Sequence, residues 1–266
     1  MQYAWHSFTS SPSSYQLLTY IAFGLIVFTV FGALVMKTPY GRFSSAMKGF
    51  KFRSKTGWFL MELPALISFI YFYLRGSDAY EAVSLFLLTV WIMHYGYRGI
   101  LFPLRMIDHS GKRSFHFSVV LIGMIVTSLH GYLNALWITE YASFITNDYL
   151  LSAPFIIGLT IYLFGFYNIV RSDSILRKLR LDNISDKRRY FIPYGGLFNY
   201  VSSAQYLSEL IAWSGFMILT MSPGGVFIFL ISAANLIPRS ISTHRWYQES
   251  FPDYPKSRKV LIPGIF

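Results

Sequence analysis

Seven long apolar runs alternate with polar stretches along this 266-residue chain. A helix needs about 20 predominantly apolar residues to cross the hydrocarbon core of a bilayer. The last run is short, about 12 residues, and would cross only with support from neighbouring helices. The pattern predicts an all-α integral membrane protein with seven transmembrane helices, over residues 15–36, 57–74, 79–103, 115–137, 150–170, 198–221 and 225–236.

The lysine and arginine residues lie almost entirely on one side of these predicted spans. Of the 23, all except Arg75 fall in four blocks, at residues 37–55, 98–113, 171–189 and 239–259. Cytoplasmic loops of membrane proteins carry an excess of lysine and arginine. We therefore expect the N-terminus to lie outside and the C-terminus to lie in the cytoplasm, with every basic loop on the cytoplasmic side.

The composition excludes an ordinary soluble domain, because only 13% of the residues are charged and 54% are hydrophobic, against about 25% charged in soluble proteins. The net charge of +11 is explained by cytoplasmic loops that contact anionic membrane lipids, so no nucleic acid partner is expected. The chain has no cysteine, which excludes disulfides, thiolate metal sites and a cysteine nucleophile. Nothing in the sequence predicts a metal site or an obligate protein partner.

No repeat or low-complexity segment divides the chain, and we interpret residues 1–266 as one domain. The two long polar stretches, 171–197 and 238–266, interleave aromatic and basic residues at the predicted cytoplasmic end. Arginine makes forked contacts to phosphate. Candidate phosphate, ribose or amide contacts there are Arg177, Arg180, Arg239, Arg245, Tyr190, Tyr200, Asn168 and Asp173, although each alone could equally be a solvated loop residue.

Two carboxylates, Glu62 and Glu209, lie inside predicted spans. An ionisable group costs about 2.5–3.5 kcal/mol at the centre of a spanning helix, so each is a candidate functional residue. Either could instead hydrogen-bond a neighbouring helix. Tyr95 lies at a depth similar to Glu62 and could polarise a carbonyl group in a dry site or simply anchor the helix at the interface. His94 and Tyr97 should point to other faces, as packing or surface groups.

Several motifs occur together between Trp58 and the C-terminus. They are Trp58-Phe59-Leu60-x-Glu62-Leu63-Pro64, His94-Tyr95-x-x-Arg98, Ser172-Asp173-x-x-Leu176-Arg177-x-Leu179-Arg180, Tyr190-x-Ile192-Pro193-x-Gly195-Gly196-Leu197-Phe198, Tyr200-Val201-Ser202, His244-Arg245-x-Tyr247 and Asp253-Tyr254-Pro255-Lys256-Ser257-Arg258-Lys259. In combination they resemble the steroid 5-alpha-reductase family.

The resemblance implies a seven-helix membrane enzyme that uses NADPH to reduce the 4,5 double bond of a 3-oxo-4-ene steroid. Glu62 and Tyr95 would hold the 3-oxo group, with Trp58 and Arg98 beside the substrate, and Tyr95 would stabilise the enolate formed when hydride reaches C5. The cofactor would be held by residues that match family positions or stand beside them: Asn168, Asp173, Arg180, Tyr190, Tyr200, Gln205, Glu209, Arg239, Arg245 and Tyr247.

Three positions depart from the family pattern: Met61 stands where glutamine is usual, Gln205 where asparagine is usual, and Thr243 where histidine is usual. They leave substrate preference and cofactor affinity open. Reduction of another conjugated lipid alkene, such as a polyprenol or an enoyl thioester, is an alternative. A membrane methyltransferase, or a transporter or lipid-binding protein, is a more distant one. The expected location is the inner membrane in a bacterium, or the endoplasmic reticulum in a eukaryote.

Overall fold

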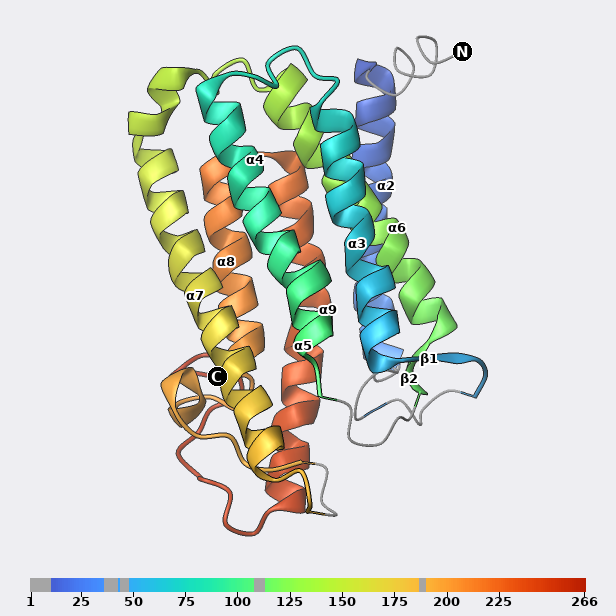
Figure 1. Cartoon of the computed structure of the whole chain (residues 1–266), viewed down its shortest axis with the longest axis vertical. Coiled ribbons are helices and arrows are strands. Elements are labelled where there is room, and N and C mark those ends of the chain that lie inside the picture. Colours follow the sequence, from blue (N-terminus) through green and yellow to red (C-terminus); the bar gives the residue numbers. More distant parts are fainter. Residues whose placement is uncertain (1–10, 36–42, 44–47, 108–112, 187–189) are drawn as a thin grey trace.

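The computed structural model describes residues 11–35, 43, 48–107, 113–186 and 190–266. In these residues the chain forms a bundle of long helices with a small sheet at one end (Figure 1). The helices are α2 (Pro12–Val35), α3 (Ser54–Tyr73), α4 (Ala82–Tyr95), α5 (Phe102–Arg105), α6 (Phe117–Leu136), α7 (Ala153–Asp182), α8 (Ala204–Thr220) and α9 (Pro223–Ser250). Shorter helical turns are η2 (Gly96–Leu101), η3 (Trp137–Tyr141), η4 (Asn147–Leu151) and η5 (Gly196–Asn199).

Six helical segments among the described residues are long and apolar enough to cross a membrane: α2, α3, α4 with its continuation to Arg105, α6 with its continuation to Tyr141, α7 and α9. The predicted span 198–221 corresponds to α8, which has 17 residues and is about 25 Å long at 1.5 Å per residue. Each of the seven predicted runs therefore contains a helix, and six of them meet the length and composition of a full crossing.

Two predicted boundaries are wrong. The last span was expected to be short, but α9 has 28 residues and continues through Pro238 to Ser250. The stretch 171–197 was expected to be a loop, but α7 continues to Asp182. Both helices extend into polar sequence, and apolar composition alone does not mark their ends.

The chain also contains two short strands, which the all-α prediction did not include. Strand β1 (Lys51–Arg53) pairs antiparallel with β2 (Arg113–His116), with Phe52 opposite Phe115. This two-stranded sheet lies at the lower end of the bundle (Figure 1). It joins the start of α3 to the start of α6, two helices that pack along their length.

Small residues let the helices α7 and α8 approach closely. A Cβ atom added to Gly165 would collide with the backbone of Ala212, and one added to Gly215 would collide with the backbone of Tyr162. In a membrane, where lipid is as apolar as a side chain, such close backbone packing is a main source of helix association. The contact fixes Asp173 on α7 relative to Glu209 on α8.

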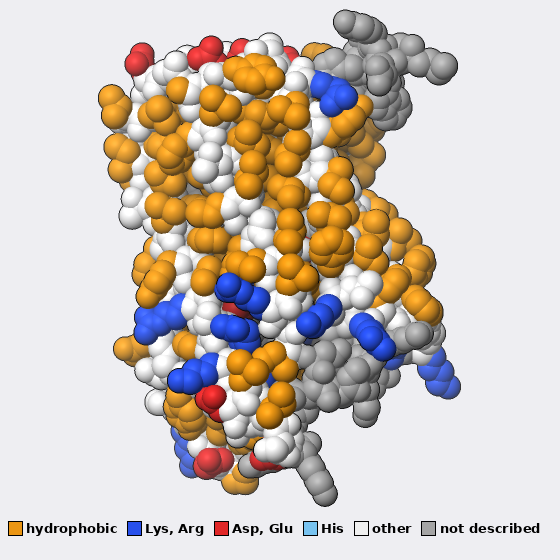
Figure 2. All heavy atoms as spheres, in the orientation of Figure 1, with side chains coloured by type: hydrophobic (Ala, Val, Ile, Leu, Met, Phe, Trp, Pro, Cys, Tyr) orange, Lys and Arg blue, Asp and Glu red, His pale blue; other side chains and the backbone are white. Residues whose placement is uncertain are grey.

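The surface is banded along the axis of the bundle. On the face shown in Figure 2, a broad hydrophobic belt has most of the lysine and arginine side chains below it, while acidic side chains lie along the upper rim and also among the basic ones below. The segregation of basic residues expected from the sequence is therefore present in three dimensions.

Candidate active site

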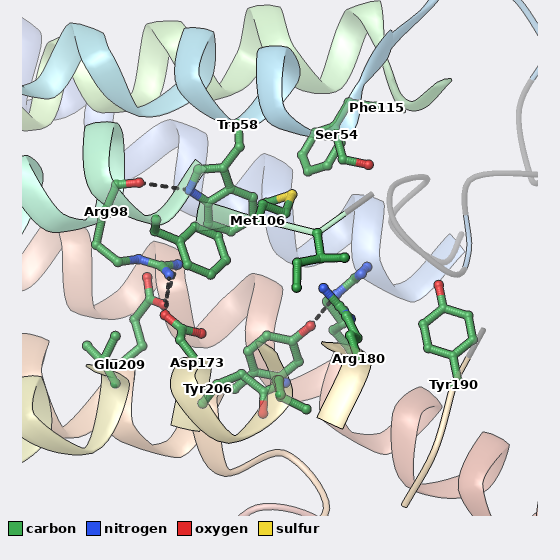
Figure 3. A pocket seen from close by; sticks show the side chains of 16 residues that line it. Ser54, Trp58, Arg98, Met106, Phe115, Asp173, Arg180, Tyr190, Tyr206 and Glu209 are labelled. Carbon is green, nitrogen blue, oxygen red and sulfur yellow. Dashed lines mark hydrogen bonds and ion pairs between the residues drawn. The ribbon is translucent and has the colours of Figure 1, made fainter. Parts of the chain in front are cut away.

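A cavity of about 190 Å³ lies at the basic end of the bundle (Figure 3). One wall is mainly apolar and comes from α3, the segment around α5, and β2: Ser54, Trp58, Phe102, Met106, Ile107 and Phe115. The opposite wall comes from α7, α8, α9 and the loop before η5, and is largely polar: Ile169, Asp173, Leu176, Arg180, Tyr190, Gln205, Tyr206, Glu209 and Arg239. Arg98 lies between the two walls.

Arg98 is held by two carboxylates in the cavity wall. Its Nη2 lies 3.0 Å from Oε2 of Glu209 and its Nη1 lies 3.5 Å from Oδ2 of Asp173. The Arg98 and Asp173 side chains are 8% and 9% exposed, and that of Glu209 is 18% exposed. Tyr97 donates a hydrogen bond of 3.2 Å to the same oxygen of Asp173. A single guanidinium therefore ties η2 to α7 and α8.

Trp58 holds the backbone and the side chain of Arg98 from the apolar wall. Its Nε1 donates a hydrogen bond of 3.1 Å to the Arg98 carbonyl. The guanidinium carbon lies 4.8 Å from the centre of the Trp58 ring and 5.0 Å from that of Phe102. These distances are within the range of cation–π attraction. The Arg98 guanidinium therefore contacts the two aromatic rings of the apolar wall as well as the two carboxylates of the polar wall.

The local backbone around Arg98 is a π-helix, η2, which follows α4 directly. Pro103 has no backbone N–H and removes a helical hydrogen bond one turn earlier. Wider π turns accommodate such gaps and are frequent at functional sites. Because the turn is wider, Tyr97 and Arg98 project in directions that an uninterrupted α-helix would not give them.

Glu62 and Tyr95 lie beside this network but do not line the cavity. Glu62 is half-buried on α3, and Gly99 of η2 packs against it closely enough that an added Cβ would contact the Glu62 backbone and Cβ at 3.6 Å. Tyr95 is 2% exposed. Tyr95 is the last residue of α4 and η2 follows directly, so both predicted residues adjoin the turn that carries Arg98.

Tyr95 sits among aromatic rings at the end of α4. Its ring centre is 4.9 Å from Trp91, 5.9 Å from His130 and 6.1 Å from Trp213. In the part of the chain that the structure describes, its hydroxyl makes no hydrogen bond. A phenol in such an apolar surrounding keeps its proton available for a ligand oxygen.

The other predicted contacts divide into two groups. Trp58, Arg98, Asp173, Arg180, Tyr190, Gln205, Glu209 and Arg239 line the cavity together. The remaining cofactor candidates do not line the cavity. Asn168 is buried and donates a hydrogen bond to the Phe164 carbonyl, and Tyr247 is buried with its ring stacked on that of Tyr254, the ring centres 5.2 Å apart. The exposed candidates are Arg177, Tyr200 and Arg245.

The sequence did not single out every residue of the cavity wall, and Tyr206 is an example. Tyr206 lines the cavity and accepts a hydrogen bond of 2.7 Å from Nε of Arg239; its spacing of three residues from Glu209 on one helix face could have identified it. Tyr97 packs against the hydrophobic core, as expected, and its hydroxyl also donates to Asp173, a contact that the sequence did not predict. His94 is buried and packed, as expected.

The sequence of this chain is similar to those of known proteins. A family model described as 3-oxo-5-alpha-steroid 4-dehydrogenase matches residues 114–266, more than half of the chain. This chain belongs to that family. The sequence is 33% identical over 251 residues to 3-oxo-5-alpha-steroid 4-dehydrogenase 1 of Rattus norvegicus, covering 94% of each protein. The resemblance inferred from the motifs is thereby confirmed.

Relatives within the 3-oxo-5-alpha-steroid 4-dehydrogenase family come from animals and plants. The chain is 36% identical over 245 residues to 3-oxo-5-alpha-steroid 4-dehydrogenase 1 of Mus musculus, covering 91% of this chain and 93% of that protein. It is 32% identical over 259 residues to the steroid 5-alpha-reductase DET2 of Solanum lycopersicum, covering 96% and 99%. The similarity therefore includes α3, with Trp58 and Glu62, as well as the helices that form the polar wall.

Proposed function

We propose that this chain reduces the 4,5 double bond of 3-oxo-4-ene steroids, with NADPH as the cofactor. Membership of the family supports the reaction class. The observation that carries the assignment to these residues is that they meet at η2: Tyr95 directly precedes this turn, Glu62 packs against its Gly99, and its Arg98 pairs with Glu209 and Asp173. Arg98, Asp173 and Glu209 line the cavity with one apolar and one polar wall, and Glu62 and Tyr95 lie outside that lining.

The polar wall suits a dinucleotide. Arg180 and Arg239 offer guanidinium groups for phosphates, and Tyr190 offers an aromatic ring. The Gln205 Oε1 is buried without a hydrogen-bond partner in the described residues, and an amide or ribose hydroxyl would satisfy it. The cavity is smaller than the roughly 300–1,000 Å³ of most ligand pockets, so a whole dinucleotide requires the lining side chains to move apart.

When bound, NADPH supplies the hydride that the reduction requires. Tyr95 donates a hydrogen bond to the 3-oxo oxygen, and Glu62 holds that oxygen and the phenol in register. Polarising the carbonyl withdraws electrons from the conjugated alkene, so that C5 accepts hydride and C4 then takes a proton. The negative charge that develops on the oxygen is stabilised by the Tyr95 hydroxyl in a site that excludes water.

Arg98 has a supporting role in this account. It offsets part of the negative charge of Asp173 and Glu209, which would otherwise repel the phosphates of a dinucleotide next to them more strongly. It also fixes η2, and with it the end of α4 that carries Tyr95.

The test is turnover by the purified protein in detergent. NADPH absorbance should fall when a 3-oxo-4-ene steroid is added, and mass spectrometry should find the steroid with two more hydrogens. A parallel panel of polyprenols and enoyl thioesters distinguishes the neighbouring reductase reactions. If NADPH does not bind with any of these substrates present, the reductase class is wrong for this chain.

We also propose that the basic end faces the cytoplasm, which places the cavity where NADPH is available. The charge banding supports this orientation. Because the chain has no cysteine, a single introduced cysteine is the only site that a maleimide can label, and its labelling shows on which side of the membrane that position lies. In intact cells, an impermeant maleimide should label Tyr80→Cys, at an exposed position near the acidic rim, and should not label Ser257→Cys, at an exposed position of the tail. The reverse pattern would invert the topology.

A further inference from the structure

Helix α3 contains a proline two residues after Glu62. Pro64 has no backbone N–H, so the Leu60 carbonyl loses the hydrogen bond that an uninterrupted α-helix would give it, and the proline ring also crowds that carbonyl. Prolines inside helices are a common cause of kinks. The position of Glu62 is therefore not fixed by the hydrogen bonds of α3 alone, and contacts with neighbouring helices contribute to it.

Neighbouring helices donate hydrogen bonds to α3 on both sides of this proline. The Thr127 hydroxyl on α6 donates a bond of 2.8 Å to the Met61 carbonyl, and it lies farther, at 3.3 Å, from the Met124 carbonyl of its own helix. On the other side, Nε1 of Trp91 on α4 donates a bond of 3.2 Å to the Ala65 carbonyl. Both donor residues are buried, and a hydrogen bond in a low-dielectric interior is electrostatically stronger than one in water.

The side chain of Met61 is seated against α6 as well. Gly123 lies four residues before Thr127, and therefore on the same face of α6. A Cβ atom added to Gly123 would collide with Cγ and Sδ of Met61. The thioether side chain thus fills the space that a larger residue at position 123 would need. Met61, which the sequence marked as a departure from the family pattern, is held to α6 through its carbonyl and its side chain.

Glu62 follows Met61 directly and faces a different neighbour. Consecutive residues of an α-helix are about 100° apart around the helix axis. Met61 packs on α6, whereas Glu62 lies against Gly99 of η2, where an added Cβ would be 3.6 Å from the Glu62 Cβ. Any shift or rotation of α3 at Met61 therefore moves Glu62 relative to η2 and to Tyr95, which directly precedes that turn.

We propose that Thr127 and Gly123 are positioning residues, which hold Met61 in place and thereby set the position of Glu62 beside η2. The inference rests on the proposed role of Glu62 in steroid reduction. Neither Thr127 nor Gly123 lines the cavity that carries the cofactor candidates, so both act through α3. A misplacement of 1 Å far from the chemistry can cost about 100-fold in rate, so loss of this seat should lower kcat and leave NADPH binding unchanged.

The first experiment measures kcat with a saturating 3-oxo-4-ene steroid, and NADPH affinity by fluorescence titration, on the purified protein in detergent. Thr127→Val replaces the hydroxyl by a methyl group and should lower kcat by about tenfold at unchanged NADPH affinity. Thr127→Ser restores the hydroxyl and should restore kcat to within about twofold of the wild type. The matched control is Thr89→Val, because Thr89 is exposed and donates its hydrogen bond of 2.9 Å within α4, to the Leu85 carbonyl; it should keep the wild-type kcat.

A second pair of variants keeps the proposal testable if Thr127→Val does not fold. Gly123→Ala forces Met61 away from α6 and should also lower kcat by about tenfold. Adding Met61→Ala removes the colliding atoms, so the double variant should recover the kcat of Met61→Ala alone. A Gly123→Ala variant with the wild-type kcat, or a double variant no faster than Gly123→Ala, would overturn the seat.

Two further measurements separate positioning from a general loss of stability. In a Glu62→Gln background, Thr127→Val should lower kcat no further, because the group that it positions is already gone; an equal loss in both backgrounds would overturn the proposal. The second measurement needs no turnover. The infrared band of the Glu62 carboxyl group, identified by its absence from Glu62→Gln, reports the hydrogen bonds and charges around that group. It should shift in Thr127→Val and return in Thr127→Ser. If the wild type reduces no steroid, the proposed function is wrong and this band alone decides the positioning role, with an unshifted band in Thr127→Val and Gly123→Ala contradicting it.

Discussion

Replacing Arg98 with methionine should destabilise the folded protein strongly. The substitution removes the guanidinium that lies 3.0 Å from Glu209 and 3.5 Å from Asp173, and leaves two nearly buried carboxylates facing each other. Breaking a buried ion pair by removing one partner costs about 3–5 kcal/mol, because the remaining charge is uncompensated. At about 1.4 kcal/mol per factor of ten, the unfolding equilibrium constant should rise by roughly 10²- to 4 × 10³-fold.

The assay is unfolding in mixed micelles of neutral detergent and dodecyl sulfate, followed by tryptophan fluorescence. Arg75→Met is the matched control. Arg75 is exposed, and its contacts are a hydrogen bond of 2.8 Å to the Tyr71 carbonyl and a cation–π contact of 3.8 Å with the Tyr71 ring. An exposed contact of this kind contributes less than about 1 kcal/mol. The control should therefore unfold almost as the wild type does.

A double-mutant cycle separates the ion pair from other effects of the substitution. Glu209→Gln removes one charge but keeps the shape of the side chain, and it should cost less in the Arg98→Met background than in the wild type. The coupling energy should be at least about 1 kcal/mol, as for residues within one network. Additive losses, or an Arg98→Met variant as stable as Arg75→Met, would refute the reasoning that Arg98 is the counter-charge of the site.

Two further outcomes are expected. Arg180→Ala and Arg239→Ala should each weaken NADPH binding by about 1.5–3 kcal/mol in a fluorescence titration, as for a lost hydrogen bond to a charged group. Lys178→Ala, an exposed control on the same helix as Arg180, should bind NADPH as the wild type does. Equal affinities of all three variants would mean that the phosphates bind elsewhere. Gly215→Val should separate α7 from α8 and lower the free energy of unfolding by about 1–3 kcal/mol or more. The control Gly24→Val lies on α2, where no atom is within 4 Å of the added Cβ, and it should lower this free energy only slightly. Similar unfolding midpoints for the two variants would contradict the close-packed interface.

The positions of the helices were predictable because a bilayer core demands long apolar runs, and each run contains a helix. The lengths of α7 and α9 were not. Their ends on the basic side of the bundle are polar sequence that is still helical, and in α9 the buried Arg239 and Ser240 show that this part packs against neighbouring elements. Apolar composition records where a helix meets lipid, and it is silent about a helix that continues beyond the membrane.

The candidate site was predictable where a residue was costly in its setting. Glu62 and Glu209 stood out because carboxylates are rare inside spans, and the motifs pointed to Arg98 and Asp173. The contact between Tyr97 and Asp173 was not foreseeable from a regular helical wheel, because it depends on the π-helix η2. The burial of Arg258 was equally hidden, because in the sequence it is one basic residue among several in the tail.

The most direct test of the proposed chemistry follows labelled hydride in the presence of a 3-oxo-4-ene steroid. With NADPH deuterated at the transferred position, the product should carry deuterium at C5 and a solvent hydrogen at C4. Glu62→Gln and Tyr95→Phe should each slow formation of this product by at least about tenfold while NADPH still binds, and Tyr167→Phe, an exposed control, should not. Full activity in both site variants, or a product without deuterium at C5, would contradict the account.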